Sequence, residues 1–336
     1  MKAIGYYQPL PVDDAAALQD LDLPAPTPGR RDLLVRVKAI SVNPVDTKVR
    51  KNAAPEAGEA KVLGWDAVGT VEAIGAEVQN FKVGDRVYYA GSITRPGANS
   101  ELHAVDERIV ALAPTSLDDA QAAALPLTTI TAWELLFDRL GVAKGGGAGQ
   151  SLLVVGGAGG VGSILIQLAR QLTQLKVIAT ASRAETRQWC LDLGAHAVID
   201  HAKPLAAELQ AAGLGQVDFV ASLTQTQQHY AQIIEALKPQ GAIGVIDDMP
   251  TLDVMPLKTK SLSLHWEMMF ARSRFETPDM AEQGKLLAEV AALVDAGKVR
   301  TTANASFGTI NAANLRRAHA LIESGKAQGK VVLSGF

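Results

Sequence analysis

The chain has 336 residues, of which 48% are hydrophobic and 20% charged, and its formal net charge is −3. This is the composition of a globular protein, and the length predicts two domains. Without a basic excess, nucleic acid and anionic membrane surfaces are not expected partners. No apolar run is long enough to span a bilayer and no signal-peptide pattern is found, so we expect no membrane association and a cytoplasmic protein. A single cysteine, Cys190, excludes an intrachain disulfide and any site built from several thiolates.

The N-terminal part of the chain predicts short strands separated by turns. Residues 34–39 alternate apolar with charged side chains, and residues 68–74 and 86–90 are further candidate strands. Alternation of this kind is typical of antiparallel strands with one face in water. We therefore expect a mostly antiparallel β domain over residues 1–124.

The pattern changes near residue 151. An apolar run at 152–155 stops at glycines and is followed by apolar residues at helical spacing. The same strand-then-helix unit recurs, with candidate strands at 177–180, 197–199, 217–221, 243–246 and 262–264. Strands that alternate with helices predict right-handed crossovers and a parallel sheet. We therefore expect a doubly wound domain of the α/β class over residues 125–299.

The C-terminal stretch predicts a helix at about 315–324 and an apolar strand at 330–333. We assign residues 300–336 to the first domain, which they complete.

A glycine-rich segment follows the first buried strand of the second domain. The sequence GAGGVG at 157–162 fits the pattern G-x-G-x-x-G and opens a helix. Small residues let the backbone approach a pyrophosphate, while free amides and the helix dipole stabilise its charge. This predicts a Rossmann dinucleotide-binding domain, with Gly157, Gly159, Gly160, Val161 and Gly162 at the cofactor. The alternative is a tight turn without a ligand.

The end of the second strand predicts which nicotinamide cofactor is bound. An acidic residue there would bond the ribose hydroxyls of NAD, but the sequence has Ser182 and Arg183. A hydroxyl and a guanidinium suit a 2′-phosphate, so we predict NADPH. The alternatives are that Arg183 is only a solvated surface residue and that Ser182 is only the N-cap of the next helix.

Several segments, in this order, resemble those of the medium-chain dehydrogenase/reductase superfamily. They are VNPVD at 42–46, GWDAVG at 64–69, FKVGDRV at 81–87, the glycine loop, and LGA at 193–195 followed by VID at 198–200. The resemblance covers nearly the whole chain. It implies a GroES-like catalytic first domain, oxidoreductase activity and a homodimer.

Zinc-dependent members of that superfamily hold a catalytic zinc with a cysteine in the first segment and a histidine in the second. This sequence has Asn43 and Trp65 there, and neither is a usual zinc ligand. The histidines show no close metal-ligand spacing and are interpreted as structural or surface residues. We expect no bound metal. In this respect the sequence resembles the zinc-free quinone oxidoreductase and enone reductase branch of the superfamily.

Without a Lewis acid the substrate must supply its own electrophilicity, as enones, enals and quinones do. The sequence therefore predicts a zinc-independent, NADPH-dependent reductase that transfers hydride to a conjugated carbonyl or quinone. Two alternatives stay open: an NADPH-binding protein without relevant turnover, and a zinc alcohol dehydrogenase with non-standard ligands.

The resemblance implies catalytic roles for Asn43, which would face the nicotinamide, and Asp46, which would orient Asn43 or a bound water. A turn before Pro44 and a helix start are the alternatives. We expect water, or Tyr6 or Tyr7, to supply the proton.

The remaining candidates are cofactor contacts implied by position: Thr128 (with Thr129), Leu223, Val245, Phe270, Gly329 and Lys330. Leu223 and Val245 fall at the carboxyl ends of strands, where doubly wound sheets bind ligands, although core packing is the alternative. Thr128 could instead cap a helix and Phe270 could only pack. Lys330 is predicted to pair with a phosphate unless it is a solvated lysine.

Overall fold

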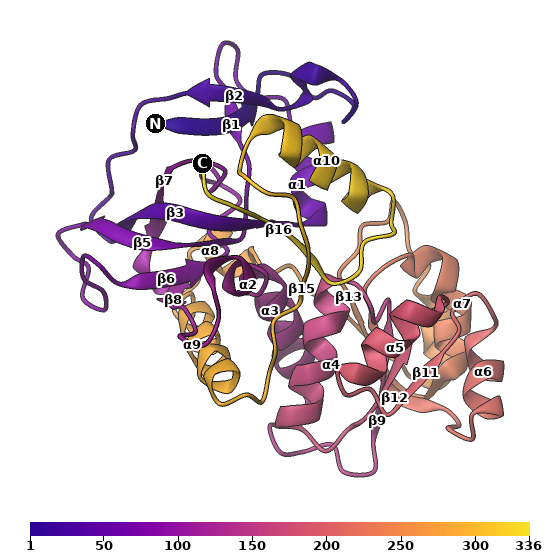
Figure 1. Ribbon diagram of the computed structural model, residues 1–336. Coiled ribbons are helices and arrows are strands. Elements are labelled where there is room, and N and C mark those ends of the chain that lie inside the picture. The colour runs from indigo at the N-terminus through magenta and orange to yellow at the C-terminus, as the bar shows by residue number, and fades with distance from the viewer. The chain divides into compact units, whose positions relative to one another are not determined.

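The computed structural model describes residues 1–336. The chain forms two compact units, one of residues Met1–Ile130 together with Phe270–Phe336 and the other of residues Thr131–Met269 (Figure 1). No helix of either unit combines the length and the apolar character needed to cross a membrane.

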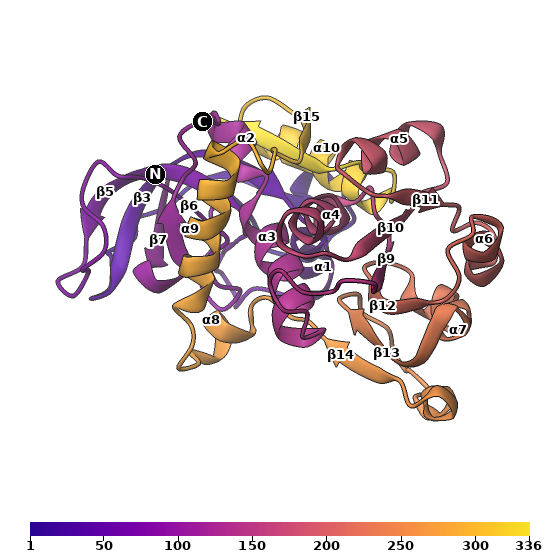
Figure 2. The ribbon, with the colours of Figure 1, turned by 90° about the horizontal axis from the view of Figure 1, so that it is seen from below.

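The second unit contains a six-stranded parallel sheet with strand order β11-β10-β9-β12-β13-β14. Its strands are β9 (Ser151–Val155), β10 (Lys176–Thr180), β11 (Ala197–Ile199), β12 (Val217–Ser222), β13 (Leu237–Val245) and β14 (Ser263–Trp266). The connecting helices are α4 (Gly160–Leu172), α5 (Ala184–Asp192), α6 (Leu205–Ala211) and α7 (Thr226–Ala236), with a 3-10 helix at Met255–Lys260. In Figure 2, α4 lies on one side of this sheet and α6 and α7 lie on the other. The predicted doubly wound Rossmann sheet is confirmed, and its strand order reverses beside β9.

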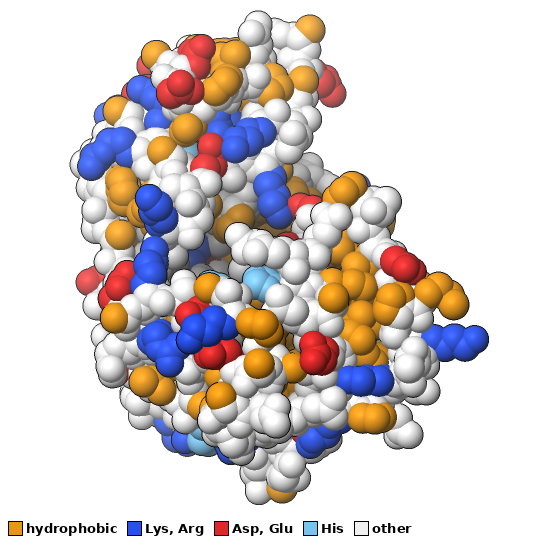
Figure 3. Space-filling view, turned by 90° about the vertical axis from the view of Figure 1, so that its right-hand side faces the viewer, with side chains coloured by type: hydrophobic (Ala, Val, Ile, Leu, Met, Phe, Trp, Pro, Cys, Tyr) orange, Lys and Arg blue, Asp and Glu red, His pale blue; other side chains and the backbone are white.

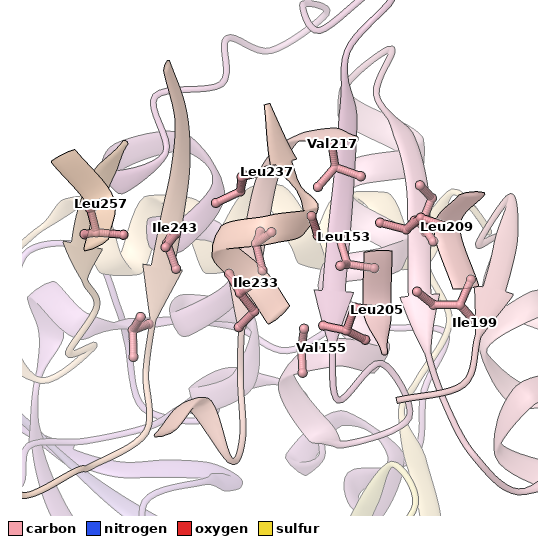
Figure 4. Close-up of a cluster of buried hydrophobic side chains, with 14 residues drawn as sticks. Leu153, Val155, Ile199, Leu205, Leu209, Val217, Ile233, Leu237, Ile243 and Leu257 are labelled. Atoms are coloured by element: carbon pink, nitrogen blue, oxygen red, sulfur yellow. The ribbon is translucent and has the colours of Figure 1, made fainter. Parts of the chain in front are cut away.

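The core of this unit explains why its strands are apolar without alternation. Leu153 and Val155 of β9 are fully buried, together with Leu205 of α6 and Ile233 of α7 on the helix side (Figure 4). Strands covered by helices on both faces have no side in water, so apolar side chains are favoured on both faces of each strand. Each such side chain contributes about 1.5–3 kcal/mol when fully buried.

The first unit is built on a seven-stranded sheet with order β15-β16-β3-β5-β6-β8, to which β7 adds through β3. Its strands are β3 (Asp32–Val42), β5 (Ala67–Ile74), β6 (Arg86–Tyr89), β7 (Leu102–Asp106), β8 (Val110–Leu112), β15 (Ala303–Ser306) and β16 (Lys330–Ser334). All pairs are antiparallel except β15 with β16. A three-stranded sheet comprises β1 (Lys2–Tyr6), β2 (Gln19–Asp22) and β4 (Lys61–Val62). The mostly antiparallel β fold class is thereby confirmed, and β16 pairs with β3.

Six helices accompany these sheets. They are α1 (Pro44–Asn52), α2 (Asp119–Ala123), α3 (Pro126–Trp133), α8 (Ala271–Phe275), α9 (Glu282–Asp295) and α10 (Ala312–Glu323), with 3-10 helices at Ala15–Ala17 and Glu107–Ile109. Helix α3 crosses from the first unit into the second and continues as a π-helix at Glu134–Arg139.

The division of the chain differs from the expected one for residues 270–299, which pack in the first unit. Helix α9 contacts β8 and the 3-10 helix Glu107–Ile109. Gly284 of α9 lies so close to this region that a Cβ atom would stand 2.7 Å from the Arg108 carbonyl oxygen. The Tyr88 hydroxyl of β6 donates to the Leu287 carbonyl. The apolar face of α9 has the same helical period whichever sheet it covers, so its pattern could not assign it to a unit.

We expect Tyr88→Phe to loosen this attachment. The Leu287 carbonyl would lose its side-chain donor in a buried environment, and the free energy of unfolding should fall by about 1 kcal/mol. Urea unfolding followed by fluorescence measures this, with Tyr7→Phe as the matched control because Tyr7 is exposed. Equal stability of the two variants would contradict the role given to Tyr88.

Candidate functional site

A buried polar cluster joins five distant points of the first unit. The Asp66 carboxylate is completely inaccessible to solvent and pairs with the Lys330 ammonium at 2.9 Å. Its other oxygen, Oδ1, accepts the backbone N–H of Leu127 at 2.7 Å. Lys330 also donates to the carbonyl of Val42, at 3.0 Å, and to the side-chain oxygen of Asn43. The cluster therefore fixes the end of β3 and the starts of α1, β5, β16 and α3 to one another.

Asn43 lies at the centre of this cluster, before the first residue of α1. Its Nδ2 donates to Asp66 Oδ2 at 2.7 Å while its Oδ1 accepts from Lys330. The side chain is fully buried. Both ends of the amide are thus occupied by protein groups, so this arrangement does not leave the amide free to contact a cofactor.

Asp46 stands in the first turn of α1 and is also buried. Its Oδ2 accepts the N–H of Asn43 at 2.7 Å and its Oδ1 accepts the N–H of Gly64 at 3.0 Å. Removal from water raises the pKa of this carboxyl to about 7. The two expectations for Asp46 coincide, because the hydrogen bond that begins the helix is also the one that orients Asn43.

Lys330 is a correction. The sequence suggested a phosphate partner or a solvated lysine, but the side chain is 3% exposed and its ammonium has three protein acceptors. An ammonium group has three hydrogens, so none remains for a phosphate. The reason is Asp66: a buried carboxylate needs a cation, and Lys330 is the one beside it.

Tyr6 is a second correction. Its hydroxyl donates toward the carbonyls of Val49 and Ala53, at 3.1 and 2.7 Å, at the end of α1. Burial raises its pKa to about 12. A buried hydroxyl with occupied acceptors and a high pKa is a poor proton donor, and Tyr7, the other tyrosine considered, is exposed.

The position that holds a zinc-ligating histidine in zinc-dependent relatives is filled by an aromatic side chain. Trp65 is 1% exposed and donates from its indole nitrogen to the Ser92 carbonyl at 3.2 Å. Its ring packs edge-on against that of Phe270, with 6.0 Å between the ring centroids. No group of three or more His, Cys, Asp or Glu side chains in the structure could hold a metal ion. The donors at Asn43 and Trp65 therefore do not fit a catalytic zinc. Phe270, predicted at the cofactor, is a packing partner of Trp65 in this arrangement.

The glycine loop of the second unit lies where the sequence placed it, between β9 and α4. A Cβ atom on Gly157 would come within 2.7 Å of the Ala179 side chain, and one on Gly162 within 2.6 Å of the Gly157 carbonyl oxygen. These two glycines let the loop close tightly against β10 and α4. A Cβ on Gly159, in contrast, would meet only the Gly156 carbonyl, at 3.4 Å.

The open side of this loop carries unpaired amides. Gly160, Val161 and Gly162 are the first residues of α4, so their N–H groups have no acceptor within the helix. No side chain caps that helix end. The amides and the positive end of the helix dipole form an anion-binding surface, and the residues present fit a dinucleotide pyrophosphate.

The strand end beside the loop carries Ser182 and Arg183, both exposed. Arg183 is the N-cap residue of α5, and its guanidinium pairs with the Glu185 carboxylate at 2.9 Å. No acidic side chain stands between the end of β10 and α5. Ser182 is therefore not the N-cap residue of α5, and the side chain of Arg183 makes no capping hydrogen bond.

The other predicted contacts divide between surface and core. Leu223 is partly exposed and follows β12 at the carboxyl edge, whereas Val245, the last residue of β13, is fully buried in the core cluster. Thr128 lies in the first turn of α3, where its hydroxyl donates to the Leu125 carbonyl at 3.2 Å and so caps no free N–H group of the helix. Gly329 precedes β16 with a φ of +57°, which suits glycine.

Asp66 is the residue that the sequence-based prediction missed. It lies in the segment GWDAVG at 64–69, where no role was predicted for it. The signal was available, because a lone carboxylate inside an apolar stretch, between Trp65 and Ala67, must be paired if it is buried.

We expect Lys330→Met to leave the Asp66 charge buried without a cation and to lower the free energy of unfolding by about 3–5 kcal/mol. Lys298→Met, at an exposed position, is the control and should change stability little. Adding Asp66→Asn to Lys330→Met should restore part of the loss, since the uncompensated charge is then gone. Additive losses in this double-mutant cycle, measured by chemical unfolding, would contradict the pairing.

Two family models match the chain: the alcohol dehydrogenase GroES-like domain over residues 29–115 and the zinc-binding dehydrogenase family over residues 193–333. A zinc-type alcohol dehydrogenase-like protein of Staphylococcus aureus is 39% identical, over 99% of this chain and 100% of its own length. The NADPH-dependent alkenal/one oxidoreductase of Arabidopsis thaliana is 39% identical over 51% of this chain and 45% of its own.

Solved structures agree. A putative zinc-dependent alcohol dehydrogenase of Rhizobium etli is 56% identical, with a TM-score of 0.96 over 100% of this chain and 98% of that one. The quinone oxidoreductase of Escherichia coli, solved with NADPH, is 25% identical, with a TM-score of 0.84 over 99% and 100%. The chain therefore belongs to the medium-chain dehydrogenase/reductase superfamily, in its zinc-free branch, and is an oxidoreductase.

Proposed function

We propose that the protein is an NADPH-dependent, zinc-independent reductase of conjugated carbonyls or quinones. The observation that carries the proposal is the loop between β9 and α4, with its unpaired amides, followed at the end of β10 by a hydroxyl and a guanidinium instead of a carboxylate. When bound, NADPH supplies a hydride to the substrate.

The contribution of the chain to cofactor binding divides into two parts. The amides at the start of α4 would hold the pyrophosphate, because Gly159 leaves the approach open. Ser182 and Arg183 would hold the 2′-phosphate by charge-assisted hydrogen bonds. Arg183 is already oriented by Glu185, and a phosphate with two charges can displace a single exposed carboxylate.

The substrate class follows from the site in the first unit. Asn43 and Trp65 supply no metal-binding donor, so nothing at these positions would polarise a simple ketone as a Lewis acid does. An enone, enal or quinone delocalises the incoming electron pair onto an oxygen several bonds away. The relatives named as quinone and alkenal/one oxidoreductases support this class. With Tyr6 occupied, we assign protonation of the product to water.

We further propose that two copies of the chain associate through the second unit. Strand β14 is the edge strand of the parallel sheet, and edge strands with free backbone groups are sites of pairing. Large exposed hydrophobic side chains accompany it, at Trp266, Met268, Val254 and Met255. Figure 3 shows hydrophobic side chains gathered in a stripe on one face of the molecule.

Replacement of Arg183 should change the affinity for NADPH and not the affinity for NADH. Arg183→Ala should weaken NADPH by on the order of tenfold, about 1.4 kcal/mol for a lost charged contact, and leave NADH nearly unchanged. Glu185→Gln should act in the opposite direction, strengthening NADPH by about 1 kcal/mol or less, because the competing carboxylate is gone. Calorimetric Kd values for both cofactors test this, and equal losses of NADPH and NADH on Arg183→Ala would contradict the assignment.

The activity itself is tested by NADPH oxidation in chelator-treated buffer, with enones, enals and quinones as acceptors and simple ketones and NADH as controls. We expect turnover of at least one conjugated acceptor and none of the ketones. Tight NADPH binding without turnover of any acceptor would favour a binding protein. Turnover that is lost in chelator and restored by zinc would favour an alcohol dehydrogenase.

A further inference from the structure

A buried polar joint connects helices α1 and α10 of the first unit, which pack against each other (Figure 1). The Arg50 guanidinium of α1 is fully buried and donates to the Glu323 carboxylate of α10 and to the Leu10 carbonyl. The Lys51 ammonium lies 3.0 Å from the other oxygen of Glu323. Two cations of α1 are thus held to α10 through one carboxylate.

His319 also belongs to this joint. It lies on α10 one helical turn before Glu323, on the same face of the helix. Its ring is fully buried, and neither of its nitrogens has a hydrogen-bond partner. On the α1 side, Arg50 Nε is likewise buried without an acceptor. A neutral imidazole has one donor and one acceptor, and burying both unmade is costly, so an apolar side chain would stabilise this position better.

What distinguishes histidine from an apolar side chain here is that it can take up a proton. Burial lowers the pKa of His319 to about 3, and the positive charges of Arg50 and Lys51 act in the same direction. The one carboxylate of the joint, Glu323, is already shared by these two cations. The closed joint therefore has no place for a third positive charge.

The other ionisable groups on the helices and strands around α10 do not offset this. Only Arg50 and Lys51 act measurably on the His319 ring. The remaining groups are Asp46 and Lys48 on α1, Tyr6 on β1, Asp20 and Asp22 on β2, Asp32, Arg36 and Lys38 on β3, and Arg316 and Arg317 on α10.

The sign of the pH dependence follows from linkage. The pKa of His319 in the closed joint lies below its ordinary value of 6.5, so the closed state has its full advantage above that pH. The advantage is lost as the pH falls from 6.5 toward 3, because an opened joint lets the ring take up a proton. The equilibrium constant for opening should then rise about tenfold per pH unit, and roughly thirtyfold in all at pH 5.

We propose that His319 is an acid-sensitive latch between α1 and α10, which keeps the joint closed while its ring is neutral and opens it when the ring takes up a proton. Asn43 immediately precedes α1, and residues 324–329 lead from α10 to Lys330. Both helices are therefore directly connected to members of the buried polar cluster, so opening in acid loosens the candidate site from behind. The inference depends on neither the cofactor nor the substrate.

Amide hydrogen exchange between pH 7 and pH 5, corrected for its intrinsic pH dependence, tests the latch. In the wild-type protein, we expect the protection of the α10 amides to fall about tenfold per pH unit below pH 6, while the amides of β9 stay protected. His319→Gln, which cannot titrate, should remove this pH dependence. His265→Gln, on β14 of the second unit, is the control and should behave as wild type.

A second buried histidine needs to be distinguished from the latch. Burial also lowers the pKa of His103, on β7, to about 4. Its protonation would weaken protection at β7, whereas the latch acts at α10. Equal losses of protection at β7 and α10, or a pH dependence at α10 that His319→Gln retains, would overturn the proposal.

A further measurement needs no variant to fold. In the wild-type protein, the imidazole NMR signals of His319 should keep their neutral positions down to pH 5 and lose intensity to a second, protonated state as the pH falls. A His319 ring that titrates near pH 6.5 while α10 stays fully protected would show that the closed joint accepts the charge, and would refute the latch.

Discussion

The first unit depends on one buried ion pair, Lys330 with Asp66, whose members are 264 residues apart in the chain. Two charges taken out of water gain little net stability from each other, but either one alone would be strongly destabilising. The pair therefore acts as a requirement: β16 must pair with β3 so that Lys330 lies beside Asp66, before either charge is compensated. Asn43 and the start of α3 are hydrogen-bonded to the same carboxylate, so their positions follow from the same requirement.

This requirement explains the division between what could and could not be predicted. The parallel sheet, the glycine loop and Arg183 at the strand end were predictable, because each is encoded by a short stretch of sequence with its own period or spacing. The pairing of Lys330 with Asp66 was not, since nothing near either residue in the sequence names its partner. The assignment of helix α9 to the first unit could not be predicted for a related reason. Its apolar face is a local signal, but the surface that it covers is formed by strands from another part of the chain.

The two candidate sites also differ physically. In the first unit the polar groups are buried, mutually satisfied and fixed, which suits a scaffold that shapes the surroundings of a reaction. In the second unit the polar groups at the carboxyl edge are exposed or unpaired, as at the amides of α4 and the guanidinium of Arg183. Exposed charges are screened by salt, so cofactor recognition should be sensitive to ionic strength while the buried cluster is not.

The pairing of β16 with β3 has a consequence for the order in which the molecule forms during synthesis. The second unit is one continuous stretch, Thr131–Met269, and all its strands have left the ribosome before the chain ends. The first unit must wait, because on one side residues 39–42 of β3 pair with the strand Lys330–Ser334. Until then that part of β3 has open backbone groups and Asp66 has no cation. A chain that stopped before Lys330 would thus have a complete Rossmann unit and an incomplete first unit, whose unpaired strand edge would be open to chaperones and proteases.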